Sequence, residues 1–117
     1  MVVEDEAAVR DLVVRSLQRN GYNVIHACDG RSALELFRQH EGAVDLVLSD
    51  VVMPELSGPD LIRALRERQP DLRALFMTGY TDDEVFRRGL QDTEMGVLHK
   101  PFGPGMLAEA VRRALDS

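Results

Sequence analysis

The sequence lacks the features that mark secreted, membrane-spanning and nucleic-acid-binding proteins. It contains one cysteine, Cys28, so no internal disulfide can form and a reducing compartment is the natural setting. No apolar run approaches the roughly 18 residues of a membrane span, and no signal peptide is visible. The net charge of −6 argues against clustered positive charge, with which proteins bind nucleic acids or anionic membranes. These absences favour a cytoplasmic protein without direct nucleic-acid or membrane contact.

What the sequence does contain is an alternation of short apolar runs and amphipathic stretches over 117 residues, enough for a single domain. The apolar runs are compact and rich in Val, Ile and Leu, as strands buried on both faces of a parallel sheet are. The expected strands are Met1–Val3, Tyr22–His26, Val44–Ser49, Arg73–Met77 and Gly96–His99. The first is shorter than a typical strand of about five to six residues. We therefore expect residues 1–117 to be one domain of a longer protein.

The stretches between the strands carry apolar residues at helical spacing. Helices are expected over 9–17, 33–37, 61–65 and 107–114. Residues 82–90 form a weaker pattern, because Gly89 costs about 1 kcal/mol relative to alanine, and we expect a short, comparatively mobile helix there. Five such units, with no G-x-G-x-x-G after the first strand, favour a (βα)₅ flavodoxin-like α/β sandwich of three layers. The expected order of its parallel strands is 2-1-3-4-5.

Polar residues stand at the carboxyl ends of four expected strands. Glu4 and Asp5 follow the first strand, Asp50 the third, Thr78 the fourth and Lys100 the fifth. In open parallel sheets, ligands bind outside the carboxyl ends of the strands, near the switch in strand order. The order 2-1-3-4-5 makes these four strands contiguous, so we expect the five side chains to meet at one edge of the sheet.

Three carboxylates at one edge require a proton or a cation among them. Two like charges about 4 Å apart repel by roughly 4 kcal/mol at an effective dielectric of 20. Mg²⁺ prefers oxygen ligands of this kind, whereas zinc is disfavoured because these strand ends carry no His or Cys. A carboxylate beside Mg²⁺, a lysine and a hydroxyl is an arrangement for phosphoryl transfer. Asp50 would be the nucleophile, with Lys100 and Thr78 contacting the phosphoryl oxygens.

At this point the chain resembles the receiver domains of two-component response regulators. The resemblance lies in Val2–Glu6 (VVEDE), Leu48–Gly58 (LSDVVMPELSG), Met77–Tyr80 (MTGY) and His99–Phe102 (HKPF), and it spans the whole chain. It implies that Asp50 is phosphorylated by a histidine kinase or a histidine phosphotransfer domain. The sequences of the blocks that begin at Asp50 and follow Thr78 are most similar to those in receivers of hybrid sensor histidine kinases. That context implies the cytoplasmic part of a membrane-bound sensor kinase.

The resemblance also assigns roles to single residues. It implies that Glu4 and Asp5 are the acidic pair of the Mg²⁺ site, with Asp5 a direct ligand and Glu4 acting partly through water. Together with Asp50, the backbone carbonyl of Val52 completes the implied ligand set. The Lys100–Pro101 peptide bond matches one that is commonly cis in the family.

Three positions bear on switching and on the lifetime of the phosphoryl group. Many receivers carry an aromatic residue where this chain has Val97, so we expect output through the Thr78–Thr81 loop and the weak fourth helix. That helix, the fifth strand and the fifth helix form the expected output face. Val52 and Tyr80 flank the expected phosphoryl group, and their apolar and aromatic side chains predict slow self-dephosphorylation.

Two other functions stay open beside the receiver. An aspartyl-phosphate phosphohydrolase shares the sheet, but such enzymes place a second Asp two residues after the nucleophile, where this chain has Val52. An interaction module that never takes phosphate is disfavoured by the intact set of site residues. The oligomeric state, monomer or weak dimer, is not indicated by the sequence.

Overall fold

A computed structural model describes residues 1–79 and 96–116. Within these ranges the chain forms five strands and four helices. The strands are β1 (Val2–Val3), β2 (His26–Ala27), β3 (Leu46–Asp50), β4 (Arg73–Thr78) and β5 (Gly96–His99). The helices are α1 (Ala7–Arg19), α2 (Gly30–Gln39), α3 (Gly58–Arg66) and α5 (Pro104–Asp116). The helix expected over residues 82–90 lies outside the described residues.

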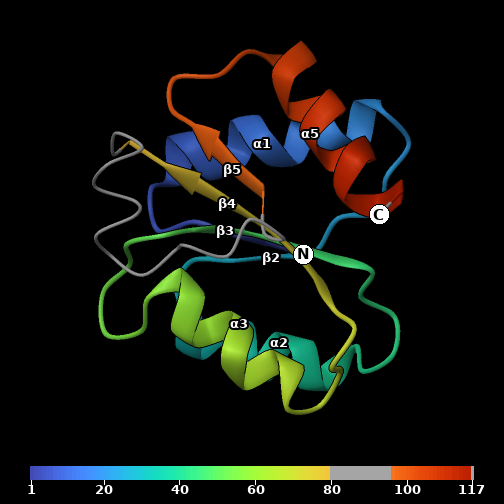
Figure 1. The fold of residues 1–117 in the computed structure, drawn as a ribbon. Helices are drawn as coiled ribbons and strands as arrows, with labels where there is room; N and C mark the ends of the chain where they lie inside the picture. The colour runs from blue at the N-terminus through green and yellow to red at the C-terminus, as the bar shows by residue number, and fades with distance from the viewer. Residues whose placement is uncertain (80–95, 117) are drawn as a thin grey trace.

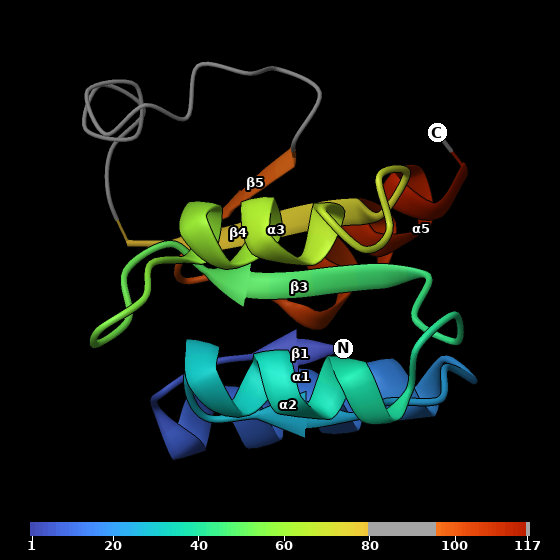
Figure 2. The same ribbon diagram turned by 90° about the horizontal axis from the view of Figure 1, so that it is seen from below.

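The strands form one parallel sheet in the order β2-β1-β3-β4-β5. Helices α1 and α5 cover one face of this sheet and α2 and α3 the other (Figure 1). Figure 2 looks onto the layer formed by α2 and α3. The predicted flavodoxin-like sandwich of three layers, with strand order 2-1-3-4-5, is therefore confirmed.

Each face of the sheet has its own apolar core. Phe37, Leu61 and Phe76 belong to the cluster under α2 and α3, whereas Val13 and Leu107 belong to the one under α1 and α5. All five side chains are at most 2% exposed. Strands buried on both faces lack an alternation of apolar and polar residues, which explains the continuous apolar runs in the sequence.

Local signals fix where the helices begin and end. The Asp29 carboxylate accepts a hydrogen bond from the Ser32 N–H at 2.7 Å and so caps α2. Ser57 caps α3 in the same way, through the Asp60 N–H at 3.3 Å. After α1, Gly21 adopts a φ of 87°, which glycine accepts without strain. Helix α1 includes the stretch 9–17 expected from the apolar spacing and ends two residues beyond it.

Four strands have bounds that differ from the prediction, β1 and β4 by one residue and β2 and β3 by more. The second strand was expected over Tyr22–His26, but only His26 and Ala27 pair in the sheet. The reason is that its neighbour β1 contributes only Val2 and Val3 to the ladder. The third strand begins at Leu46 rather than Val44 and extends to Asp50, which pairs with Met77.

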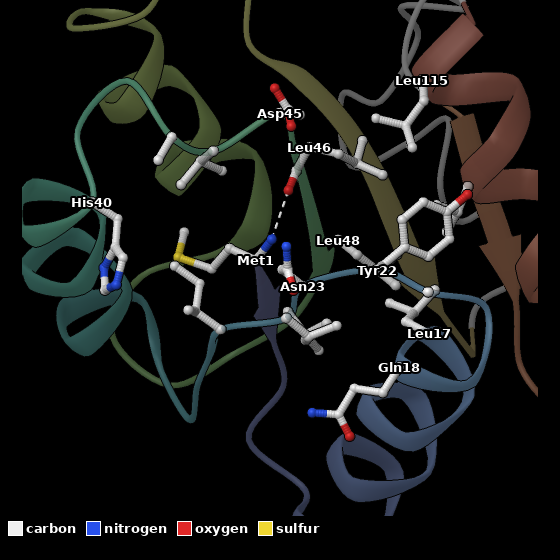
Figure 3. A pocket seen from close by; sticks show the side chains of 17 residues that line it. Met1, Leu17, Gln18, Tyr22, Asn23, His40, Asp45, Leu46, Leu48 and Leu115 are labelled. Atoms are coloured by element: carbon white, nitrogen blue, oxygen red, sulfur yellow. Dashed lines mark hydrogen bonds between the residues drawn. The ribbon is translucent and has the colours of Figure 1, made fainter.

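A hollow of about 770 Å³ lies at the amino ends of the central strands (Figure 3). Its lining is largely apolar and includes Leu17, Leu48 and Leu115. The Met1 ammonium donates a hydrogen bond to the Leu46 carbonyl at 2.7 Å. Burial lowers the pKa of this ammonium to about 6, although the Asp45 carboxylate opposes the shift.

Among the described helices, none has the length and apolar character needed to cross a membrane.

Candidate functional site

The sheet register brings the expected side chains to one edge. Val3 pairs with Ser49 and Thr78 with His99, so the residues that follow in each strand leave the sheet together. Carboxylate oxygens of Glu4, Asp5 and Asp50 all lie within 4.8 Å of one another. Segments separated by as many as 96 positions in the chain thus meet in one acidic cluster.

Lys100 supplies the positive charge of this cluster. Its ammonium donates to Glu4 Oε1 at 2.7 Å and lies 3.4 Å from Asp50 Oδ2. Burial alone would lower the pKa of Lys100, but the hydrogen bond to Glu4 and the charges of Asp50 and Glu4 outweigh it and raise the pKa. Lys100 is therefore a permanent cation at neutral pH. Its backbone N–H donates to the Thr78 carbonyl at 2.8 Å, which anchors the residue after β5.

The three carboxylates differ in their exposure to water. The Glu4 side chain is fully buried, Asp50 is 13% exposed and Asp5 is exposed. Partial desolvation raises the pKa of Asp5, and the hydrogen bond to Glu4 and the Glu4 charge raise it further, while Lys100 acts in the opposite direction. With one ammonium among three carboxylates, the cluster keeps an excess of negative charge.

Backbone contacts hold the end of β3. The Val51 N–H donates both to the Met77 carbonyl at 3.0 Å and to Asp50 Oδ1 at 3.1 Å. The Ser49 hydroxyl donates to the Asp50 carbonyl at 2.9 Å. A Cβ on Gly58 would lie 2.2 Å from that same carbonyl oxygen, so α3 begins directly against Asp50. This tight packing fixes the direction in which the Asp50 carboxylate leaves the strand.

The other expected site residues lie as follows. Thr78 is 2% exposed at the end of β4. Val52 is 44% exposed in the loop after Asp50. Val97 is half-buried and packs against the core under α2 and α3. The Lys100–Pro101 peptide bond is cis. Tyr80, expected to shield the phosphoryl group, lies outside the described residues.

The cluster fits a hard divalent cation. Its donors are oxygen atoms from three carboxylates, and within residues 1–79 and 96–116 no histidine or cysteine joins them. One ammonium cannot neutralise three carboxylates, which leaves negative charge for an ion to balance. Asp5 and Asp50 are the carboxylates with some exposure to solvent, so an ion could reach them. The donor set is thus one that suits a hard divalent cation such as Mg²⁺ or Ca²⁺.

Sequence reasoning missed two features of the site. One is the direct pairing of Glu4 with Lys100; both residues were expected at this edge, but strand order does not reveal which partner a long side chain selects. The other is the close approach of Gly58 to Asp50. The only signal for it in the sequence is a glycine at the start of the expected third helix, next to Pro59.

Comparison with known proteins agrees with this geometry. The family model of the response regulator receiver domain matches residues 1–112. Sensor kinase CckA of Brucella abortus is 46% identical over 116 residues, which cover 99% of this chain and 12% of the kinase. Response regulator receiver protein CpdR of the same organism is 34% identical over 98% of this chain and 94% of its own length.

Solved structures give the same result. The crystal structure of the receiver domain from the hybrid histidine kinase CckA has a TM-score of 0.82 at 36% identity, covering 97% of this chain and 95% of that one. Chemotaxis protein CheY4 of Vibrio cholerae has a TM-score of 0.86 at 33% identity, with the same coverage of both chains. Sequence and structure match over nearly the whole chain, and the chain therefore belongs to the response regulator receiver domain family.

Proposed function

We propose that Asp50 accepts a phosphoryl group from the phosphohistidine of a histidine kinase or a histidine phosphotransfer domain. An Asp50 carboxylate oxygen attacks phosphorus and forms the new O–P bond. The P–N bond breaks, and the imidazole leaves with the electron pair of that bond. The observation that carries the proposal is the Asp50 carboxylate lying 3.4 Å from the Lys100 ammonium and beside two further carboxylates.

Each neighbouring group has a defined part in this transfer. The Lys100 ammonium offsets charge on the phosphoryl oxygens, and the Thr78 hydroxyl donates a hydrogen bond to one of them. Asp5, Asp50 and the Val52 carbonyl would hold Mg²⁺, with Glu4 acting partly through water. When bound, Mg²⁺ supplies positive charge that stabilises the transferring group. The hydrogen bond from the Val51 N–H at the end of β3 helps to keep the Asp50 carboxylate oriented toward the proposed phosphoryl and Mg²⁺ positions.

The same proposal covers the context of the domain. We propose that it is the receiver part of a longer protein, a hybrid sensor histidine kinase, in the cytoplasm. The 46% identity to sensor kinase CckA over 99% of this chain supports that context. Output is proposed to run through the Thr78–Thr81 loop to the face formed by the fourth helix, β5 and α5, because Val97 offers no aromatic ring. The exposed Val52 side chain and Tyr80 are proposed to slow hydrolysis of the phosphoryl group.

Incubation with acetyl phosphate and Mg²⁺, followed by intact-mass spectrometry, tests this function. The wild-type chain should gain one phosphoryl group, Asp50→Ala none, and omission of Mg²⁺ should prevent the gain. Asp45→Ala, which removes an exposed carboxylate at the opposite end of the sheet, is the matched control and should gain one group. Rapid consumption of acetyl phosphate without stable addition would indicate a phosphohydrolase. No addition and no turnover would indicate an interaction module.

A further inference from the structure

Glu4 is a fully buried carboxylate whose shortest polar contact is with the Lys100 ammonium, beside weaker contacts with Asp5 and the Glu6 N–H. Its side chain is 0% exposed, and burial of a charge without a partner is strongly unfavourable. Oε1 accepts the Lys100 ammonium at 2.7 Å, within the range of a strong charge-assisted hydrogen bond. Oε2 lies 3.5 Å from the Glu6 backbone N–H. Glu4 therefore depends on Lys100 whatever the state of Asp50.

The contact between Lys100 and Asp50 is looser. At 3.4 Å it exceeds the usual length of a charge-assisted hydrogen bond by about half an ångström. Asp50 is also the less buried of the two carboxylates and accepts the Val51 N–H, so it has other sources of stabilisation. The distances rank Glu4 first and Asp50 second as partners of the ammonium.

The sheet order explains how this arrangement serves Asp50. β1 and β5 are not neighbours, because β3 and β4 lie between them. The Glu4 and Lys100 side chains must therefore extend toward each other across the ends of β3 and β4, and Asp50 is the last residue of β3. Both backbones are tied down, Glu4 through the Arg10 guanidinium on its carbonyl at 2.9 Å and Lys100 through Thr78. An ammonium held by Glu4 consequently stays beside Asp50.

We propose that Glu4 is a positioning residue that holds the Lys100 ammonium beside Asp50 independently of the charge on Asp50. The role assigned to Lys100 rests on the proposed phosphoryl transfer, whereas the placement of the ammonium does not. When Asp50 changes its charge on phosphorylation, Lys100 keeps its anchor and does not swing into solvent. Glu4 thereby acts on the reaction through Lys100 rather than by touching the phosphoryl group.

The test observes the Lys100 ammonium directly by ¹⁵N NMR, with no phosphoryl donor present. A hydrogen-bonded ammonium exchanges its protons slowly, and loss of a charge-assisted bond should speed this exchange about tenfold or more. We expect Glu4→Gln, which keeps the shape and removes the charge, to cause that acceleration. Asp50→Asn should leave the exchange rate within about twofold of wild type, because the stronger partner remains.

Glu6→Gln is the matched control, since it makes the same chemical change at an exposed neighbour whose side chain caps nothing. It should leave both the Lys100 signal and the rate of phosphorylation by acetyl phosphate unchanged, whereas Glu4→Gln should slow phosphorylation. If Asp50→Asn accelerates the exchange as much as Glu4→Gln does, Asp50 is the anchor and the proposal is wrong. If Glu4→Gln does not fold, the exchange rate of the Lys100 ammonium in Asp50→Asn tests the proposal by itself. An unchanged rate supports the proposal, and an accelerated rate contradicts it. A failed phosphorylation assay with an intact Lys100 pattern would overturn the function and leave the positioning role standing.

Discussion

The two ends of the sheet are built on opposite principles. At the carboxyl ends, three carboxylates and one ammonium are packed within a few ångströms, and one of the carboxylates is completely buried. At the amino ends lies the largely apolar hollow of about 770 Å³, where burial lowers the pKa of the Met1 ammonium. The carboxyl end thus concentrates paired charges, while the amino end is lined mainly by apolar side chains.

This difference shows that volume alone is a poor guide to the site. The roomy amino end offers apolar walls and scattered polar groups, whereas the crowded carboxyl end offers oxygen donors that converge on one point. In a parallel sheet all strands deliver their last residues to the same edge, so chemistry accumulates there.

Removal of the Lys100 ammonium at the carboxyl end of the sheet should have the largest effect on the free energy of unfolding. Lys100→Met leaves the buried Glu4 carboxylate without its cationic partner, and we expect the free energy of unfolding to fall by about 3 kcal/mol. Because the pKa of Lys100 is raised on folding, the stabilisation is complete at neutral pH and is lost only above the ordinary pKa of lysine. Urea denaturation at pH 7 measures the change. Asp50→Asn is the comparison and should be neutral or stabilising, since it relieves repulsion; an equal loss in both variants would contradict the pairing.

A cavity at the amino end should cost somewhat less. Leu48 is 1% exposed and lines the hollow, and Leu48→Ala should lower the free energy of unfolding by about 2 kcal/mol. This is the low end for such substitutions, because the neighbouring space already limits the contacts that are lost. Phosphorylation of Asp50 should persist, since the site lies at the other end of the sheet. Leu12→Ala, at a side chain that is 59% exposed, should change stability by less than about 0.5 kcal/mol. Equal losses in the two variants would show that the hollow is not part of the packed core.

The smallest loss of stability is expected at Asp29, a carboxylate at the carboxyl ends of the strands that only caps a helix. Asp29→Ala should lower the free energy of unfolding by about 1 kcal/mol, through loss of the bond from the Ser32 N–H. Hydrogen bonds from Ser32 lower the pKa of Asp29, so the ionised cap stabilises the fold above about pH 4 and is lost as the pH falls further. Thermal unfolding of wild type and variant at pH 7 and pH 3 measures this. A difference in stability that stays constant between the two pH values would rule out the ionised carboxylate as the cap.

The sequence predicts topology better than it predicts strand length or side-chain pairing. Alternating apolar runs and helical stripes dictate the parallel sheet, and the strand order brings Glu4, Asp50 and Lys100 to one edge. The extent of β2 could not be predicted, because Tyr22 and the residues after it are apolar enough for a strand but lack partners in β1. The choice of Glu4 over Asp50 by Lys100 depends on sub-ångström differences in reach, which the residue pattern does not encode.

The contact of Gly58 with Asp50 has a mechanical consequence. The first residue of α3 lies directly against the Asp50 carbonyl, with no room even for a Cβ between them. If Asp50 is the phosphoacceptor, as proposed, a partner that displaces α3 should also displace the backbone of Asp50, with no side chain between them.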